Sequence, residues 1–340
     1  SLFVVPKFKV DAEGNIGERN GVSCGSIEHK MGICASATAV LNFDEAEGFL
    51  VFEPNRGLEA MFTFMNTARL GTAVQGVCHA EAAFQGALPY AKERRSMRAL
   101  SGKKEPEAKA DALIWHPDVR RMLLTQKAIA EGGRAMIYDA LKIGDQMFNA
   151  AATGDEAAYK QFDGELGFYT PILKGFLTEM GLEAANLGVQ VFGGHGYIKE
   201  HGMEQIVRDA RISTLYEGTT GIQALDLLGR KVLLGTKGKC VRDFTLRMAL
   251  FAKPYLLKRT PLGAMARVLA ARAAEWNVLT TAIMLRAPKD KEVVGSASVD
   301  YLMYSGFVMM GYYWALQAAK AQALLDSGAG QKLEQYGPYR

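Results

Sequence analysis

The fold class is decided at residues 53–77, which read EPNRGLEAMFTFMNTARLGTAVQGV. A turn-forming Pro-Asn-Arg-Gly segment closes the region before it, and apolar side chains then recur every three or four residues from Leu58 to Val77. That spacing puts them on one face of an amphipathic helix. We predict a long helix that runs to about Arg98, and therefore a mainly helical protein.

The same helical periodicity returns several times downstream of this segment. We predict helices from Pro117 to about Ala152, from about Pro171 to Val191, and from about Thr219 to Leu234. Proline suits the first turn of a helix, where its missing N–H has no helical partner to lose. Residues 235–239 (GTKGK) form a plausible linker, and helical periodicity resumes beyond them to about residue 327.

The region upstream has the composition of β-structure, because residues 1–53 are rich in Gly, Val, Thr, Ser and Phe. Turn signals occur at residues 11–15 and 20–21, and alternating apolar and polar side chains predict a strand at residues 39–44. The apolar start at residues 1–6 reads as a strand entered midway. Two or three strands cannot bury a core by themselves.

Three regions follow from these patterns. We predict a partial β-domain at residues 1–53, an antiparallel helical bundle at residues 54–235 and an appended helical domain at residues 236–340. The most apolar tract, residues 301–319, contains tyrosines, glycines and Gln317, which is typical of a helix buried in a bundle. We therefore expect no membrane span.

The composition of the 340 residues, 49% hydrophobic and 22% charged, excludes a disordered chain, a collagen and a small disulfide scaffold. The net charge of +4 is small and spread along the chain, so it does not indicate a nucleic-acid binder, but it is compatible with a pocket for an anionic ligand. The four cysteines form no CxxC pair and, with His29, show no metal-ligand spacing. We expect reduced thiols, no metal and a cytoplasmic protein.

The first segment with chemical content is QVFGGHGY at residues 190–197. Glycines at positions 193, 194 and 196 let the backbone approach a ligand closely and expose N–H donors to an anion. A tight turn between two helices is the ordinary interpretation of such a cluster, so the glycines alone are weak evidence.

The second segment is YEGTTGIQ at residues 216–223, where Glu217 stands just before a predicted helix. One interpretation is a helix N-terminal charge, which the helix dipole favours. The other is a proton-abstracting base between an aromatic side chain and a glycine, because a carboxyl that an apolar substrate partly desolvates holds protons more strongly.

These two segments, joined by EQIVRDAR at residues 204–211, resemble the flavin domain of the acyl-CoA dehydrogenase family at a specific spacing. Three further stretches resemble the longer bacterial subgroup with an extra C-terminal domain: IEHKMGI (27–33), ASAT (35–38) and SVDYLMYSG (298–306). The resemblance implies that residues 1–53 are the C-terminal part of the family's middle β-domain. It also implies that the family's N-terminal domain has no counterpart here, so that the chain is a fragment or a shortened relative of a longer protein.

The resemblance also implies a reaction. Glu217 removes the α-proton of an acyl-CoA thioester while the β-hydride passes to N5 of FAD, which gives a trans-2-enoyl-CoA. The acyl group is expected to be 3-methylmercaptopropionyl or a fatty acyl chain. Electron-transfer flavoprotein is the expected electron acceptor, and the expected assembly is a homodimer or homotetramer. Two alternatives stay open: an acyl-CoA oxidase of the same fold, and a flavin-free or inactive fragment that acts as a scaffold.

Ten further positions carry over from the resemblance, residue by residue. Those implied to contact FAD, in part across a subunit interface, are Arg94, Ser96, Gln190, Gly193, Gly194 and Thr219. Those implied to contact the substrate are Asn66, Arg69, Tyr216 and Gly218. Arginine suits the FAD phosphates because its guanidinium pairs with them in a bidentate manner. Arg69 lies on an otherwise apolar face and therefore needs an anionic partner.

Overall fold

The computed structural model describes residues 1–328, apart from the side chains at positions 63 and 66. The described part begins with six short strands, β1 (Leu2–Val4), β2 (Phe8–Val10), β3 (Ile16–Arg19), β4 (Val22–Ile27), β5 (Ala39–Phe43) and β6 (Phe49–Val51). They form three antiparallel two-stranded sheets, which pair β1 with β6, β2 with β3, and β4 with β5. Most of their side chains are exposed, so these sheets hold no core of their own.

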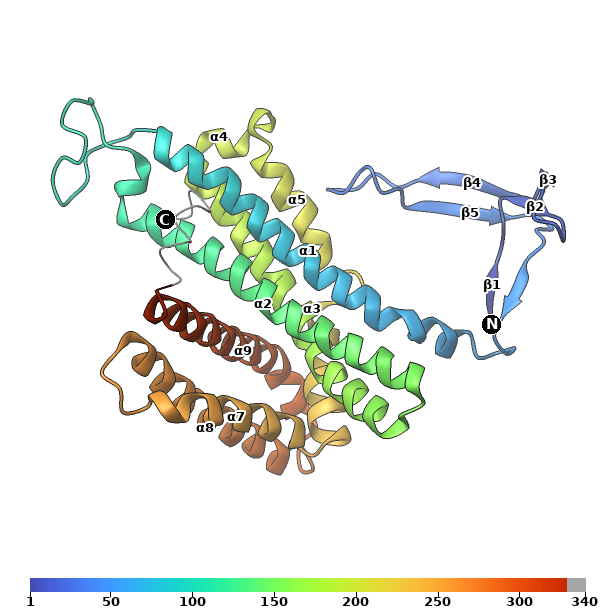
Figure 1. The fold of residues 1–340 in the computed structure, drawn as a ribbon. Coiled ribbons are helices and arrows are strands. Elements are labelled where there is room, and N and C mark those ends of the chain that lie inside the picture. The colour runs from blue at the N-terminus through green and yellow to red at the C-terminus, as the bar shows by residue number, and fades with distance from the viewer. Residues whose placement is uncertain (329–340) are drawn as a thin grey trace.

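The strand region extends away from the helices (Figure 1), and the loop between β4 and β5 is hydrogen-bonded to them. The backbone N–H of Ile33 donates to Asp209 Oδ1 at 2.6 Å, and Arg208 Nη1 donates to Met31 O at 2.9 Å. Both partners lie on helix α5 (Met203–Ser213). The strand predicted at residues 39–44 is confirmed as β5, and the turn at residues 11–15 joins β2 to β3.

Three long helices, α1 (Gly57–Glu93), α2 (Pro117–Thr153) and α3 (Glu156–Phe192), run alongside one another and form the centre of the molecule (Figure 1). Helices α1 and α3 touch backbone to backbone where glycines face each other. A Cβ added to Gly76 would lie 2.2 Å from the carbonyl oxygen of Leu177, and one added to Gly181 would lie 2.4 Å from that of Gly76. This close approach fixes the position of α3, on which the site described below depends.

Two predicted helix boundaries are wrong. Helix α1 ends at Glu93 rather than at Arg98, because an isolated bridge between Arg95 and Ala112 draws the chain into an extended path. Helix α3 begins at Glu156, fifteen residues before the predicted start at Pro171. Its N-terminus is capped by Asp155, whose side chain accepts from the N–H of Ala158, and the proline lies inside the helix, where packing offsets the missing hydrogen bond.

The remaining elements follow in chain order. They are η1 (Leu113–Trp115), α4 (Gly194–Tyr197), η2 (Lys199–His201), α5, α6 (Thr220–Leu225), the π-helical η3 (Asp226–Gly235), α7 (Lys239–Ala252), η4 (Lys253–Tyr255), α8 (Pro261–Arg286) and α9 (Glu292–Asp326). The predicted helix at 219–234 is therefore a short α-helix that widens into a π-helix. The mainly helical fold class is confirmed.

A polar cluster joins the appended helices to the bundle. Asp139 on α2 accepts from Arg247 on α7 (2.9 Å), from Tyr313 on α9 (2.5 Å) and from Tyr169 on α3 (3.3 Å). Burial raises the pKa of Tyr169 and of Tyr313 well above the ordinary value, so both stay protonated donors. The four elements are thereby fixed to one another.

Helix α9 is the one helix among residues 1–328 that is long and apolar enough to cross a membrane. Its side chains at Tyr301, Leu302 and Met309 are buried against the other helices. A core helix of a soluble protein meets the same criteria, so the length and composition of α9 are weak evidence for a span.

Candidate active site

The loop between α5 and α6 holds Glu217 in a left-handed backbone conformation. Its φ is +56°, and that of Gly218 is +89°. The left-handed region is sparsely populated for residues other than glycine, and such residues persist where surrounding contacts over-determine them. Both residues are half-buried.

Two fully buried side chains hold the successive carbonyls of this loop. Gln223 Nε2 donates to the carbonyl oxygen of Glu217 at 3.0 Å, and Lys174 Nζ donates to that of Gly218 at 2.5 Å. The hydroxyl of Thr219 caps α6 by accepting from the N–H of Ile222 at 3.3 Å. The loop is thus tied to both α3 and α6.

Tyr216 reaches the opposite helix of the bundle. Its hydroxyl donates to Gln75 Oε1 on α1. The residues predicted around the base therefore lie together, since Tyr216, Glu217, Gly218 and Thr219 form one loop held by α1, α3 and α6.

Buried charged side chains lie near Lys174, the donor to this loop. The side chain of Arg69 is 8% exposed and lies 3.6 Å from Asp226, measured from Nη1 to Oδ2. The anionic partner that the sequence predicts for Arg69 is therefore a side chain of the protein itself, Asp226. Lys174 has no exposed surface, and burial lowers its pKa to about 8, although the charges of Glu179 and Glu217 act against this.

Four residues are predicted to contact substrate. Among them, Arg69 lies close enough to Lys174 for its positive charge to lower the pKa of that amine. Its role toward substrate stays a prediction, as do those of Tyr216 and Gly218. The side chain of Asn66 lies outside the part of the chain that the structure describes.

The predicted cofactor residues other than Thr219 gather at the far end of the bundle. Arg94 and Ser96 follow the last turn of α1, whereas Gln190, Gly193 and Gly194 lie at the end of α3, and all five are exposed. The two ends are joined by Tyr90 and Phe192, whose rings stack with centroids 4.0 Å apart.

The guanidinium of Arg94 is available to a ligand. Its neighbours Arg95 and Arg98 are paired with Glu105 and Asp111, whereas Arg94 takes part in no ion pair within residues 1–328. An exposed guanidinium that forms no ion pair in the described part of the chain can bind the phosphates of a ligand.

Within one chain, the base loop at residues 216–219 and the group of residues around Arg94 lie far apart. Gln75, which binds Tyr216, and Arg94 are 19 residues apart on or at the end of α1, so they are separated by about 28 Å at 1.5 Å per residue. The base loop and the Arg94 group are therefore two separate parts of the surface.

Asp111 organises the loop that carries Arg94 and Ser96. Its carboxylate is fully buried and accepts from the N–H groups of Ala99, Lys104 and Glu105 at 2.8 to 3.0 Å. These bonds hold the pKa of Asp111 far below the ordinary value.

We expect Asp111→Asn to lower the unfolding temperature at pH 7, because a neutral amide accepts these bonds less strongly. The lowered pKa means that the carboxylate stabilises the fold fully above about pH 4 and loses this effect as the pH falls toward the folded-state pKa. The gap between parent and variant should therefore narrow below pH 4 in thermal melts. A gap that widens there contradicts this role for Asp111.

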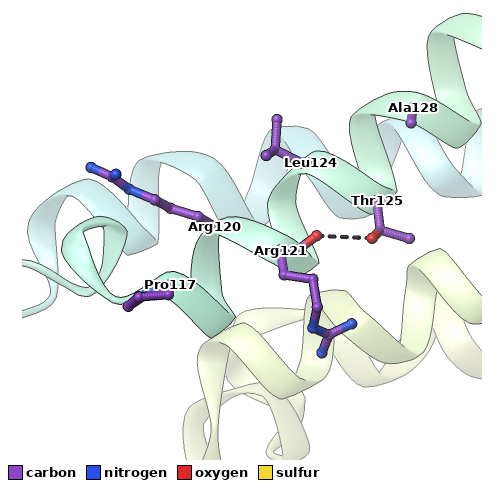
Figure 2. Close-up of a pocket in the computed structure, with 6 residues that line it drawn as sticks. All are labelled: Pro117, Arg120, Arg121, Leu124, Thr125 and Ala128. Carbon is purple, nitrogen blue, oxygen red and sulfur yellow. Dashed lines mark hydrogen bonds between the residues drawn. The ribbon is translucent and has the colours of Figure 1, made fainter. Parts of the chain in front are cut away.

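A shallow pocket of about 540 Å³ lies on the first turns of α2 (Figure 2). It is lined by Pro117, Arg120, Arg121, Leu124, Thr125 and Ala128. The hydroxyl of Thr125 donates to the carbonyl oxygen of Arg121 within the helix, so that group is already satisfied. None of the predicted site residues lines this pocket.

Sequence reasoning missed the residues that hold the base. Lys174 stands alone in the apolar run Ile172-Leu173-Lys174-Gly175-Phe176, and that isolation is the signal that could have found it. Gln223 ends the motif at residues 216–223, but no local pattern predicts its hydrogen bond to the carbonyl oxygen of Glu217. Gln75 carries no sequence signal.

Two stretches of the chain match known family models. Residues 55–233 match the family model "Acyl-CoA dehydrogenase, C-terminal domain", and residues 244–336 match "Acetyl-CoA dehydrogenase C-terminal like". The 3-methylmercaptopropionyl-CoA dehydrogenase of Ruegeria pomeroyi is 43% identical over 332 residues, which are 96% of this chain and 54% of the relative. The broad-specificity linear acyl-CoA dehydrogenase FadE5 of Mycobacterium tuberculosis is 35% identical over 97% of this chain and 55% of the relative.

Solved structures show the same fold. Caenorhabditis elegans ACDH-11 in complex with C11-CoA superposes with a TM-score of 0.69 at 18% identity, over 90% of this chain and 52% of that one. The Bacillus anthracis acyl-CoA dehydrogenase complexed with FAD gives 0.69 at 21% identity, over 88% and 50%. This chain spans about half the length of the curated relatives it matches. The chain belongs to the acyl-CoA dehydrogenase family.

Proposed function

We propose that this chain carries the catalytic base of an FAD-dependent acyl-CoA dehydrogenase, with Glu217 as that base. The observation that supports the proposal best is the loop itself. Glu217 has a left-handed backbone, and the carbonyls of residues 217 and 218 are each fixed by a fully buried donor. A carboxylate held in this way can be aimed at one carbon of a bound substrate.

The chemistry required of Glu217 is the removal of the α-proton of a thioester. The α C–H bond breaks, the proton moves to a carboxylate oxygen of Glu217, and the electron pair forms the α,β double bond as the β-hydrogen leaves with its own pair. When bound, FAD supplies the acceptor for that hydride. The loop that positions this carboxylate is held by Lys174 and Gln223.

The FAD phosphates would be held by Arg94, with Ser96, Gln190, Gly193 and Gly194 beside it. These residues lie about 28 Å from the attachment of the base loop along α1. We therefore propose a homodimer or homotetramer in which the Arg94 group of one subunit completes the FAD site of another. Thr219, next to the base, would contact the FAD of its own subunit.

The substrate proposed first is 3-methylmercaptopropionyl-CoA, after the relative that is 43% identical, with linear fatty acyl-CoA thioesters next. Electron-transfer flavoprotein is the proposed electron acceptor.

The test is anaerobic reduction of the purified protein by a series of acyl-CoA thioesters that includes the methylthiopropionyl thioester. We expect flavin absorbance that is bleached by at least one thioester, with turnover supported by an acceptor dye and not by O₂. Equal turnover with O₂ indicates an oxidase of the same fold. Protein that stays colourless after incubation with FAD indicates a scaffold and contradicts the proposal.

A further inference from the structure

The amine of Lys174 has an unusual place in the bundle. It lies in the middle of α3 with no exposed surface, beside the buried side chains of Leu173 and Phe176. It takes part in no ion pair within residues 1–328, and its printed hydrogen bond is the one at 2.5 Å to the carbonyl oxygen of Gly218. A buried ammonium without a close counter-ion is costly, so its retention needs a reason other than stability.

Three charged side chains act on the amine of Lys174. Glu217 from the loop and Glu179 from α3 favour the charged form of Lys174, whereas Arg69 from α1, itself paired with Asp226 of η3, disfavours it. Glu179 also accepts from the hydroxyl of Thr220, which leaves its negative charge in place. What directs Lys174 to the loop is therefore its hydrogen bond to the carbonyl oxygen of Gly218.

We propose that Lys174 is a positioning residue for Glu217, which fixes the loop through the carbonyl of Gly218. This inference rests on the proposed role of Glu217 as the base. The carbonyl of Glu217 is held by Gln223 and that of Gly218 by Lys174, so the two donors together keep the left-handed pair in place.

The test compares Lys174→Met and Lys174→Gln with Thr170→Val. Methionine has nearly the length of lysine and suits an apolar core, so we expect Lys174→Met to fold with an unfolding temperature within about 4 °C of the parent. Thr170 lies one turn earlier on α3, is buried, and donates to Leu166 O at 2.8 Å within its own helix. Its variant reports the effect of disturbing α3 without touching the loop.

Two measurements test whether Lys174 positions the loop that carries Glu217. In the active enzyme, both Lys174 variants should lower kcat by about tenfold or more with little change in KM, because the carboxylate of Glu217 is no longer held in its productive position. In the free protein, amide exchange of residues 212–224 should be faster in Lys174→Met than in the parent. Thr170→Val should change neither.

A Lys174 variant whose kcat and amide exchange match those of Thr170→Val overturns the proposal. The two proposals fail separately. Parent-like turnover in Glu217→Gln removes the base assignment, whereas unchanged exchange of residues 212–224 in Lys174→Met shows that Lys174 does not hold the loop.

Discussion

Glu217→Gln is expected to lower the rate of acyl-CoA dehydrogenation by about 10³-fold, within the range typical of the loss of a general base. Glutamine has nearly the same shape, and the contact with Gln223 is made by the backbone carbonyl of residue 217, so the loop should keep its conformation. FAD content and unfolding temperature should therefore match the parent. The measurements are steady-state turnover with an acceptor dye, flavin absorbance and a thermal melt.

The matched control is Glu183→Gln on α3, an exposed carboxylate that receives the same chemical change. It should turn over at the parent rate. If Glu217→Gln also does so, the base is another group.

The largest effect on stability is expected for Gly76→Val. A Cβ at position 76 would lie 2.2 Å from the carbonyl oxygen of Leu177 and 2.6 Å from its carbon, and neither backbone atom can move without shifting α3. We expect the free energy of unfolding to fall by about 3 kcal/mol or more, the range of severe overpacking. Thermal melts or denaturant titrations measure this directly.

Gly71→Ala on the same helix is the control. A Cβ there meets no atom within 4 Å, and alanine is favoured over glycine in a helix by about 0.5–1 kcal/mol. This variant should be at least as stable as the parent. Equal losses in the two variants would show that α1 tolerates no added side chain anywhere, which contradicts a specific contact between α1 and α3.

Sequence reasoning succeeded where the signal is local. The start of α2 at Pro117 follows from the proline at the first turn, and the strand β5 follows from the alternation of apolar and polar side chains. It failed at the start of α3, because Pro171 is a local stop signal that packing within the bundle overrides. The bridge between Arg95 and Ala112, which ends α1 early, joins residues too far apart for any local pattern.

The candidate site likewise contains residues that the local sequence predicts and residues that only the packing of the helices brings together. The motif around Glu217 is contiguous, so the sequence could predict Tyr216, Gly218 and Thr219 beside it. The donor to Gly218 stands 44 residues away at Lys174, and only the packing of α3 against the loop brings the two together. The ion pair of Arg69 with Asp226 likewise requires the turn of α6 into the π-helical η3.

A crystal structure of the FAD-loaded protein with an unreactive acyl-CoA analogue tests the account most directly. We predict a carboxylate oxygen of Glu217 within about 3.5 Å of the carbon next to the thioester, with the flavin ring on the opposite face of the acyl chain. A Glu217 side chain turned toward solvent, with another group facing that carbon, would contradict the assignment.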